Sequence, residues 1–450
     1  MLLDLSLELL EAIGAQLTQS DCAILRTVSR GLNSAFYRLF FSILVLKTHR
    51  NGLNEDGVQM HRTLATGGTG WSVHARTVRM IPAKALSAEG ARYDKPVDLL
   101  ATTLASLSNI QTVMFSVDGT FKITTDFLNT APTVQNLELN ISGTINVSPL
   151  QVRSLRKFTL VSSAQGSNRR RCVRRRTGTR PPPAMYQDIV NLISQNLLNS
   201  LHMEGTSDWS AIWRMLRSRT EGVRLAEITT NVVTKELFDY LISYSGLEKL
   251  TLLSPDGGSL NASNRLADTF FETVLPHHAE SLTELSCGAA YETRFSFGIH
   301  NVNIVSLLHK LTKLEMSINA GAVRTVSRYQ DKEGQWEPIV TFGFALEVEQ
   351  ADIDSVVTLL LKTAAALPAL RELVIVPAET EDNRNDWTGN GELNHKPIVD
   401  VAIGRAVRAF RTDVPCSAIV YAGSYTYELR ALNGLACGES ATALGYGRTG

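Results

Sequence analysis

The sequence predicts an α/β protein in which a small helical module precedes a longer domain of repeated strand-and-helix units. Apolar residues recur at helical spacing within residues 1–46, and a short apolar pattern recurs from about residue 100. Amphipathic segments of helical length separate several copies of that pattern. We therefore expect a curved, mostly parallel sheet with helices outside it.

Composition excludes several classes of protein. The 450 residues are 44% hydrophobic and 20% charged, which is ordinary for a folded chain and excludes a wholly disordered protein or a fibre. The five cysteines include no C-x-x-C pair, so neither a zinc ribbon nor a disulfide framework is expected, and a reducing compartment is favoured. No basic segment precedes the leucine-rich start, and the apolar run at 39–46 is too short to span a membrane. These features predict a cytoplasmic or nuclear protein that does not contact a membrane.

Residues 1–46 form the predicted helical module. Ser6 is a candidate N-cap for a first helix over about 7–17, and Thr18, Ser20 and Asp21 can cap a second. Gly31 is the expected break before a third helix. The apolar stripe consists of Leu9, Leu10, Ile13, Leu17, Ile24, Leu25, Val28, Leu32, Phe36 and Phe40. Such a small unit buries little apolar surface, so it must pack against the rest of the chain or a partner.

The pattern φ-x-x-φ-x-φ, where φ is apolar, recurs over residues 100–425. Its copies begin at Ile110, Val134, Leu155, Leu198, Leu247, Leu282, Leu311 and Leu370, and a weaker copy begins at Leu225. The intervals run from 21 to 59 residues, and several lie in or near the leucine-rich-repeat range of about 20–29. The pattern predicts an irregular leucine-rich-repeat-like solenoid; the alternative is an ordinary α/β domain. Residues 47–99 are then a connecting region and 426–450 a tail.

Three insertions interrupt the repeats. Residues 162–185, rich in Arg and Pro, are expected to be a disordered loop. Residues 319–349 predict a pair of strands with a turn at 332–334, and 377–397 is a polar stretch of turn formers. Tyr329, Trp336 and Trp387 in the last two insertions are candidates for target recognition; the alternative is that they cover the ends of the solenoid.

The arginines of the first insertion explain the zero net charge. Lys plus Arg and Asp plus Glu each total 44, but 169–180 holds seven arginines and no acid. The rest of the chain therefore has 37 basic and 44 acidic residues, a net charge of −7. The closely spaced members of the cluster are Arg169, Arg170, Arg171, Arg174, Arg175 and Arg176. A nuclear localisation signal and a solvated loop are the two interpretations, and the lack of interleaved aromatic residues argues against nucleic-acid recognition.

No catalytic signature is present. GGTG at 67–70 lacks the spacing of a dinucleotide fingerprint and the Lys-Ser/Thr of a P-loop. The stretch 382–392 departs from a calcium loop at Arg384 and Trp387. His277 and His278 near Cys287 are interpreted as a surface turn followed by a core cysteine. The sequence therefore predicts a protein that is not an enzyme and carries no metal or cofactor.

The N-terminal LDLSLELLEAIGAQLTQSDCAILRTVSRGLNSAFYRLFF resembles an F-box. The matching positions are Leu5, Leu7, Glu8, Leu9, Leu10, Ile13, Leu17, Asp21, Leu25, Val28, Ser29 and Arg30. Ser6 stands in place of the usual proline, and Asn33 or Phe36 where many F-boxes have tryptophan. The whole chain is similar to the F-box and leucine-rich-repeat-like proteins of mushroom-forming fungi, notably in EITTNVVTKELFDYLISYSGLEKLTL, ADTFFETVLPHHAESLTELSCGAAYE and NHKPIVDVAIGRAVRAFRTDVPCSAIVYAGSYTYELR.

This resemblance implies a substrate-receptor subunit of an SCF-type cullin-RING E3 ubiquitin ligase. The F-box would bind a Skp-type adaptor, and through it a cullin, while the repeats would hold a target protein. The implied adaptor-binding residues are Leu5, Ser6, Leu7, Leu9, Leu10, Ile13, Leu17, Leu25, Val28, Leu32 and Phe36. The alternative, based on Ser6 and the missing tryptophan, is a repeat scaffold for protein interactions without a ligase function.

Overall fold

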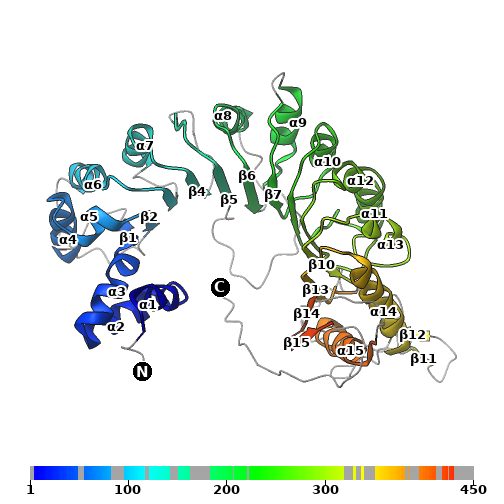
Figure 1. Ribbon diagram of the computed structural model, residues 1–450. Helices are drawn as coiled ribbons and strands as arrows, with labels where there is room; N and C mark the ends of the chain where they lie inside the picture. Colours follow the sequence, from blue (N-terminus) through cyan, green and yellow to red (C-terminus); the bar gives the residue numbers. More distant parts are fainter. Residues whose placement is uncertain are drawn as a thin grey trace. The chain divides into compact units, whose positions relative to one another are not determined.

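The structure is a computed structural model, and its elements are labelled as in Figure 1. It describes residues 5–48, 55–82, 96–116, 121–141, 150–162, 183–205, 207–219, 222–318, 328–330, 336–338, 350–380, 384, 395–411, 418–423 and 425–429. The chain divides into two compact units, Met1–Asp208 and Trp209–Gly450.

The first unit begins with three helices and continues with alternating strands and helices. Its elements are α1 (Leu7–Gly14), α2 (Gln19–Val28), α3 (Arg30–Phe41), β1 (Ile43–Thr48), α4 (Glu55–Ala65), α5 (Gly70–His74), β2 (Thr77–Pro82), α6 (Pro96–Ala105), β3 (Thr112–Ser116), α7 (Phe121–Thr130), β4 (Asn136–Ile141), β5 (Lys157–Ser162), α8 (Pro183–Ser194) and β6 (Ser200–Gly205). The strands pair in parallel and in chain order from β1 to β6. Helices α6, α7 and α8 lie on one side of the strands that they connect (Figure 1).

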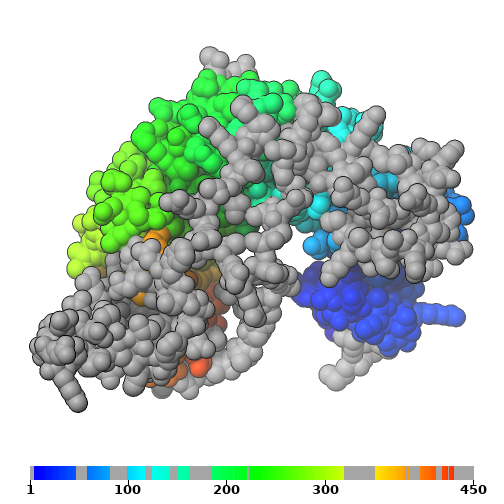
Figure 2. Space-filling view, turned by 180° about the vertical axis from the view of Figure 1, so that it is seen from behind, coloured from blue at the N-terminus to red at the C-terminus, as the bar shows by residue number. Residues whose placement is uncertain are grey.

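The second unit repeats this arrangement. Its elements are α9 (Ser210–Ser218), β7 (Glu227–Thr230), α10 (Lys235–Ile242), β8 (Lys249–Leu253), α11 (Leu260–Thr269), a π-helical turn (Phe270–Val274), α12 (Leu275–His278), β9 (Glu284–Gly288), α13 (Val302–Ser306), β10 (Lys313–Ser317), β11 (Arg328–Gln330), β12 (Trp336–Pro338), α14 (Gln350–Ala366), β13 (Glu372–Val376), α15 (His395–Ala409), β14 (Ile419–Ala422) and β15 (Tyr425–Glu428). Strands β7, β8, β9, β10, β13 and β14 pair in parallel in that order, and β15 adds an antiparallel edge. Residues 222–318 form a continuous surface in Figure 2.

The apolar pattern places these strands. The three apolar residues of every predicted copy are buried, each with no more than 6% of its surface exposed. In β3, for example, Ile110 precedes the strand while Val113 and Phe115 point to the same face of it. Burying side chains of this kind is worth about 1.5–3 kcal/mol each. The prediction of an α/β fold with a mostly parallel sheet is confirmed.

Backbone hydrogen bonds join each strand to the next in a recurring way. The carbonyl just before a strand accepts from two successive amides at the start of the following strand. Arg76 O, for example, accepts from the amides of Gln111 and Thr112 at 2.8 and 2.9 Å. The carbonyls of Ser42, Gln111, Gln135, Arg156, Ala226, Glu248, Thr283 and Thr312 accept in the same way. These bonds set equivalent residues of successive strands side by side.

The sheet begins earlier, and extends further, than the sequence predicted. The region 47–99 was expected to be a connection and 426–450 a tail, yet β1 and β2 lie in the parallel sheet and β15 runs into the expected tail. Ala75, Val78 and Met80 form a copy of the pattern that is all buried. This copy was not predicted because its first residue, Ala75, is small and the pattern was searched with large apolar residues.

Other sequence predictions are met with adjusted boundaries. The strand pair expected in 319–349 is present as β11 and β12, which pair antiparallel, although the predicted turn lies outside the described residues. The first helix ends at Gly14 rather than near residue 17. The break before α3 lies at Ser29, not at Gly31, because the Ser29 side chain caps α3 by accepting from the Leu32 amide at 3.2 Å.

His278 lies in the core rather than in a surface turn. It is 1% exposed, its Nδ1 accepts from the Leu247 amide at 3.4 Å, and its Nε2 lies 3.0 Å from the carbonyl of Leu241. The imidazole thus links β8, α10 and α12. Burial lowers the pKa of His278 to about 4, against the opposing effect of the Leu241 carbonyl and with a smaller contribution from His277.

This pKa makes the fold sensitive to acid. The unfolded chain takes up a proton at His278 near pH 6.5, whereas the folded chain resists protonation until about pH 4. Stability is therefore complete above pH 6.5 and falls as the pH drops toward 4. We expect urea unfolding to show a loss of no more than about 2 kcal/mol from this group. His278→Gln should reduce the pH slope; an unchanged slope would contradict the assignment.

Candidate functional site

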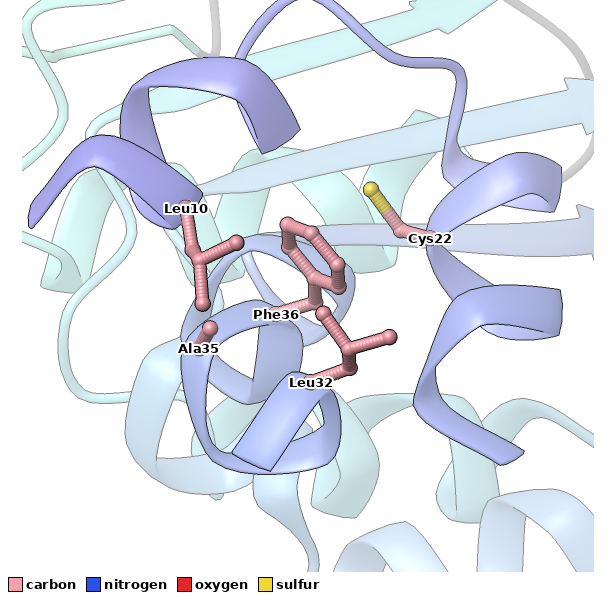
Figure 3. Packing of buried hydrophobic residues seen from close by; sticks show 5 residues of the cluster. All are labelled: Leu10, Cys22, Leu32, Ala35 and Phe36. Carbon is pink, nitrogen blue, oxygen red and sulfur yellow. The ribbon is translucent and has the colours of Figure 1, made fainter. Parts of the chain in front are cut away.

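The N-terminal module has a small core of its own. Leu10, Cys22, Leu32, Ala35 and Phe36 are each no more than 5% exposed and point toward one another from the three helices (Figure 3). Leu17, Leu25, Leu39 and Phe40 pack against them. The module is visible as a compact dark-blue body in Figure 2. Its core uses one side of each helix, while the other side of α3 packs through Tyr37 and Phe41 against His74 and Trp71 of α5.

Caps define where its helices begin. Ser6 accepts a hydrogen bond from the Leu9 amide at 3.5 Å and is the N-cap of α1. Thr18 and Asp21 form a reciprocal capping box at the start of α2, as the sequence predicted. A serine in place of the usual proline therefore still starts the first helix at the expected residue.

Six large apolar side chains of the module are exposed. They are Leu5, Leu7, Leu9, Ile13, Ile24 and Val28, with exposed fractions from 36% to 64%. Leu9 and Ile13 are four residues apart on α1, as are Ile24 and Val28 on α2, so each pair lies on one face of its helix. Leaving six such groups in water in a module of this size is typical of a surface that a partner covers.

The structure divides the predicted adaptor-binding residues into two groups. Leu5, Ser6, Leu7, Leu9, Ile13 and Val28 are exposed and can contact a partner directly. Leu10, Leu32 and Phe36 are buried, and Leu17 and Leu25 are partly buried, so these five hold the module together. Helical spacing identified the apolar stripe but could not tell which of its edges faces the core.

The module is firmly joined to the start of the sheet. Gln19 Nε2 donates to the carbonyls of Phe40 and Ile43 at 3.0 and 2.7 Å, and Trp71 Nε1 donates to Ile43 O at 3.2 Å. The guanidinium of Arg26 lies over the Phe40 ring at 4.4 Å, an arrangement that cation–π attraction stabilises. The exposed apolar side chains of α1 and α2 therefore have a fixed place relative to β1.

A polar groove lies on the strand face of the first unit. Its volume is about 460 Å³, and it is lined by Thr112, Asn136, Leu137, Glu138, Lys157, Thr159, Val161, His202 and Glu204. Most of these occupy the positions between the buried apolar residues of β3 to β6, so they point away from the core. These groove residues were not predicted from the sequence. The pattern that could have identified them is the polar residue that lies between the second and third apolar residues of each triplet.

Register places the groove residues next to one another. Glu138 pairs with Thr159, and Thr159 pairs with His202, so these three form a row across β4, β5 and β6. Glu204 Oε2 lies 3.4 Å from His202 Nε2, and Asn140 Nδ2 donates to Glu138 Oε1 at 3.3 Å. Thr159 is only 8% exposed and forms the floor.

The corresponding face of the second unit carries charges that neutralise one another. Register aligns Glu227, Lys249, Glu284, Lys313 and Glu372 across five strands. Lys249 Nζ lies 3.7 Å from Glu227 and 2.8 Å from Glu284, and Lys313 Nζ lies 2.6 Å from Glu372. The hydrogen bond that Lys249 donates to Glu284 raises the pKa of Lys249, and the one that Lys313 donates to Glu372 raises the pKa of Lys313. This charge ladder leaves little net charge for a partner.

Several predicted residues lie outside the described structure. They are the arginines Arg169–Arg176, Trp387, and the side chains of Tyr329 and Trp336. Arg384, which excluded a calcium loop, forms an ion pair with Asp256 at 2.6 Å and lies over the Tyr291 ring at 4.1 Å. It therefore fixes part of the third insertion to the loop after β8.

Among the described residues, no three His, Cys, Asp or Glu side chains cluster as a metal site would require. Burial raises the pKa of the Cys22 and Cys287 thiols, which makes both poor nucleophiles. No helix in the described part of the chain is long and apolar enough to cross a membrane. The features with functional potential among the described residues are therefore the exposed apolar side chains of the module and the polar groove.

Comparison with known proteins returned no match: no family model and no curated protein matches the chain.

Adjacent leucines of α1 separate the two roles of the module. Leu10→Ala should destabilise α1–α3 by about 2–5 kcal/mol, because it leaves a cavity in the core. Leu9→Ala should change stability by no more than about 0.5 kcal/mol, because Leu9 is 54% exposed. Hydrogen exchange of the amides of the three helices measures both effects. Equal protection losses in the two variants would contradict this division.

Proposed function

We propose that this protein is a substrate-receptor subunit of an SCF-type cullin-RING E3 ubiquitin ligase. The observation that carries the proposal is the set of exposed large apolar side chains on the N-terminal module, which are Leu5, Leu7, Leu9, Ile13, Ile24 and Val28. The F-box-like order of residues over 5–30 supports a Skp-type adaptor as the partner that contacts them.

The rest of the chain is suited to the second task of a receptor, which is to hold a target. We interpret the parallel strands with their recurring apolar triplets as a leucine-rich-repeat-like solenoid. Side chains between the triplet residues project from the strand face and are free to differ from one strand to the next. A surface of this kind recognises a protein target through contacts from many side chains.

In this proposal the chain positions the target protein and does not itself catalyse the transfer of ubiquitin. It would hold a target near the enzyme that carries ubiquitin, and proximity would raise the effective concentration of the target lysine. The rigid junction at Gln19 and Trp71 supports this role, because a receptor with a loose joint would lose much of that advantage.

The competing proposal is an interaction scaffold without a ligase partner. Its support is the departure from the usual F-box at Ser6 and at Asn33. The structure gives both residues local roles: Ser6 caps α1, and Asn33 Oδ1 accepts from Arg26 Nε at 3.0 Å. Binding to an adaptor distinguishes the two proposals, since only the receptor requires it.

The test measures binding of the full chain to a purified Skp-type adaptor from a mushroom-forming fungus. Leu9→Asp with Ile13→Asp should weaken binding by about 100-fold, because two apolar contacts are replaced by charges that must be desolvated. Both side chains are exposed in the free protein, so the module should still fold. Leu10 is unsuitable for this test because a charge there would disrupt the core.

Leu197→Asp is the matched control. Leu197 is 95% exposed in the same unit but lies after α8, outside the module. It should bind the adaptor as tightly as the unmodified chain. Absence of measurable adaptor binding by the unmodified chain would favour the scaffold, and equal weakening in both variants would exclude the α1 face as the docking surface.

A further inference from the structure

We propose that the polar groove of the first unit binds an arginine side chain of the target protein. This inference rests on the proposed function, because it names the chemistry of the target that the receptor holds. It assigns recognition to Glu138, His202 and Glu204, with Thr159 as the floor.

The acceptors of the groove surround a space that a cation fits. Glu138 on β4 lies beside Thr159 on β5, whereas Glu204 on β6 lies beside Val161, one row further toward the carboxyl ends of the strands. The two carboxylates therefore line the groove diagonally across β5. Strands lie about 4.8 Å apart, so β4 and β6 are about 10 Å apart. An arginine side chain that lies along this gap can donate to either carboxylate. Among the described residues, no lysine or arginine forms an ion pair with Glu138 or Glu204, which favours a positively charged occupant.

His202 adds an independent observation. Its Nε2 is shielded from solvent and makes no hydrogen bond within the described residues, although Glu204 Oε2 is 3.4 Å away. A buried ring nitrogen without a hydrogen bond is costly, and a ligand that offers a donor removes that cost. Arginine carries five N–H donors in a fixed plane, enough for two carboxylates and one imidazole nitrogen, whereas lysine carries three.

Lys157 sets the orientation of the ligand. It lies one row before Thr159 on β5, whereas Glu204 lies one row after His202 on β6. The groove is therefore acidic toward the carboxyl ends of its strands and basic toward their start. An arginine binds at the acidic end, and Lys157 is placed to meet a carbonyl or carboxylate of the same ligand.

The charge ladder of the second unit explains why this groove, and not the whole strand face, is selective. There each lysine lies beside glutamates of neighbouring strands at 2.6–3.7 Å, so the charges are already paired. Displacing such a pair would cost a ligand the contacts that the pair makes. In the groove, neither Glu138 nor Glu204 forms an ion pair with a lysine or arginine of the described residues, and Glu204 instead lies 3.4 Å from His202.

The experiment uses the full chain with methyl-labelled threonine and methionine, without the adaptor. The probes are the acetylated, amidated peptides Gly-Ser-Arg-Ser-Gly, Gly-Ser-Glu-Ser-Gly and Gly-Ser-Leu-Ser-Gly. The arginine peptide should shift the methyl signals of Thr159 and Met114, with an affinity about tenfold above that of the other two. Glu138→Gln and Glu204→Gln should each weaken it about tenfold, since both keep side-chain shape but remove charge.

Glu284→Gln is the control, because it removes a carboxylate from the same kind of strand face in the charge ladder. It should leave the arginine peptide unaffected. Unchanged affinity in Glu204→Gln, or tighter binding of the glutamate peptide, would overturn the proposal. A methyl signal of Thr159 that shifts with protein concentration in the absence of peptide would show that a second copy of the chain occupies the groove. That result would also overturn the proposal. Adaptor binding is measured on the same variants. If they bind the adaptor but the arginine peptide does not bind the groove, the arginine site is wrong and the proposed function is not affected.

Discussion

The structure depends on one constraint: a short parallel strand must be covered along both of its edges. At nine of the strand-to-strand steps, the carbonyl just before a strand accepts from two successive amides at the start of the next strand, so these strands keep a constant register. Constant register stacks the apolar triplets into continuous ladders, and stacking supplies the burial that one strand-and-helix unit lacks. The same register aligns the intervening side chains into rows. The polar groove and the charge ladder are both consequences of this alignment.

The N-terminal module meets a different constraint, because three short helices must fold around a small core while several of their large apolar side chains stay exposed. Its core consists of only five buried residues, reinforced by partly buried neighbours and by side-chain caps at Ser6, Thr18 and Ser29. Leu9 and Leu10 are adjacent yet have opposite exposures, since successive residues on a helix differ by about 100° in direction. Capping and the contacts of Trp71 compensate for apolar surface that the module leaves exposed.

Much of the fold could be predicted from the sequence, because burial on a parallel strand leaves a short and strict pattern. Every copy that was identified lies at a buried strand, including the weak one at Leu225. The strand β2 was missed because a small residue, Ala75, fills a position where the search expected a large one. The groove could not be predicted in this way. Glu138 and Thr159 are 21 residues apart in the chain and Thr159 and His202 are 43 apart, and only the observed register makes them neighbours.

The distribution of charge on the strand faces follows from the same geometry. In the second unit a glutamate and a lysine alternate along one row, so each strand neutralises the next and the row also favours correct register. In the first unit the equivalent row is Thr77, Thr112, Asn136, Lys157 and Ser200, which is nearly uncharged. The carboxylates of its groove, Glu138 and Glu204, lie in later rows of the sheet, and no lysine of β3 to β6 lies in the same row as either of them. The first unit thus keeps carboxylates without a lysine in these rows, whereas the second unit pairs its own, and this difference is what the proposed arginine site rests on.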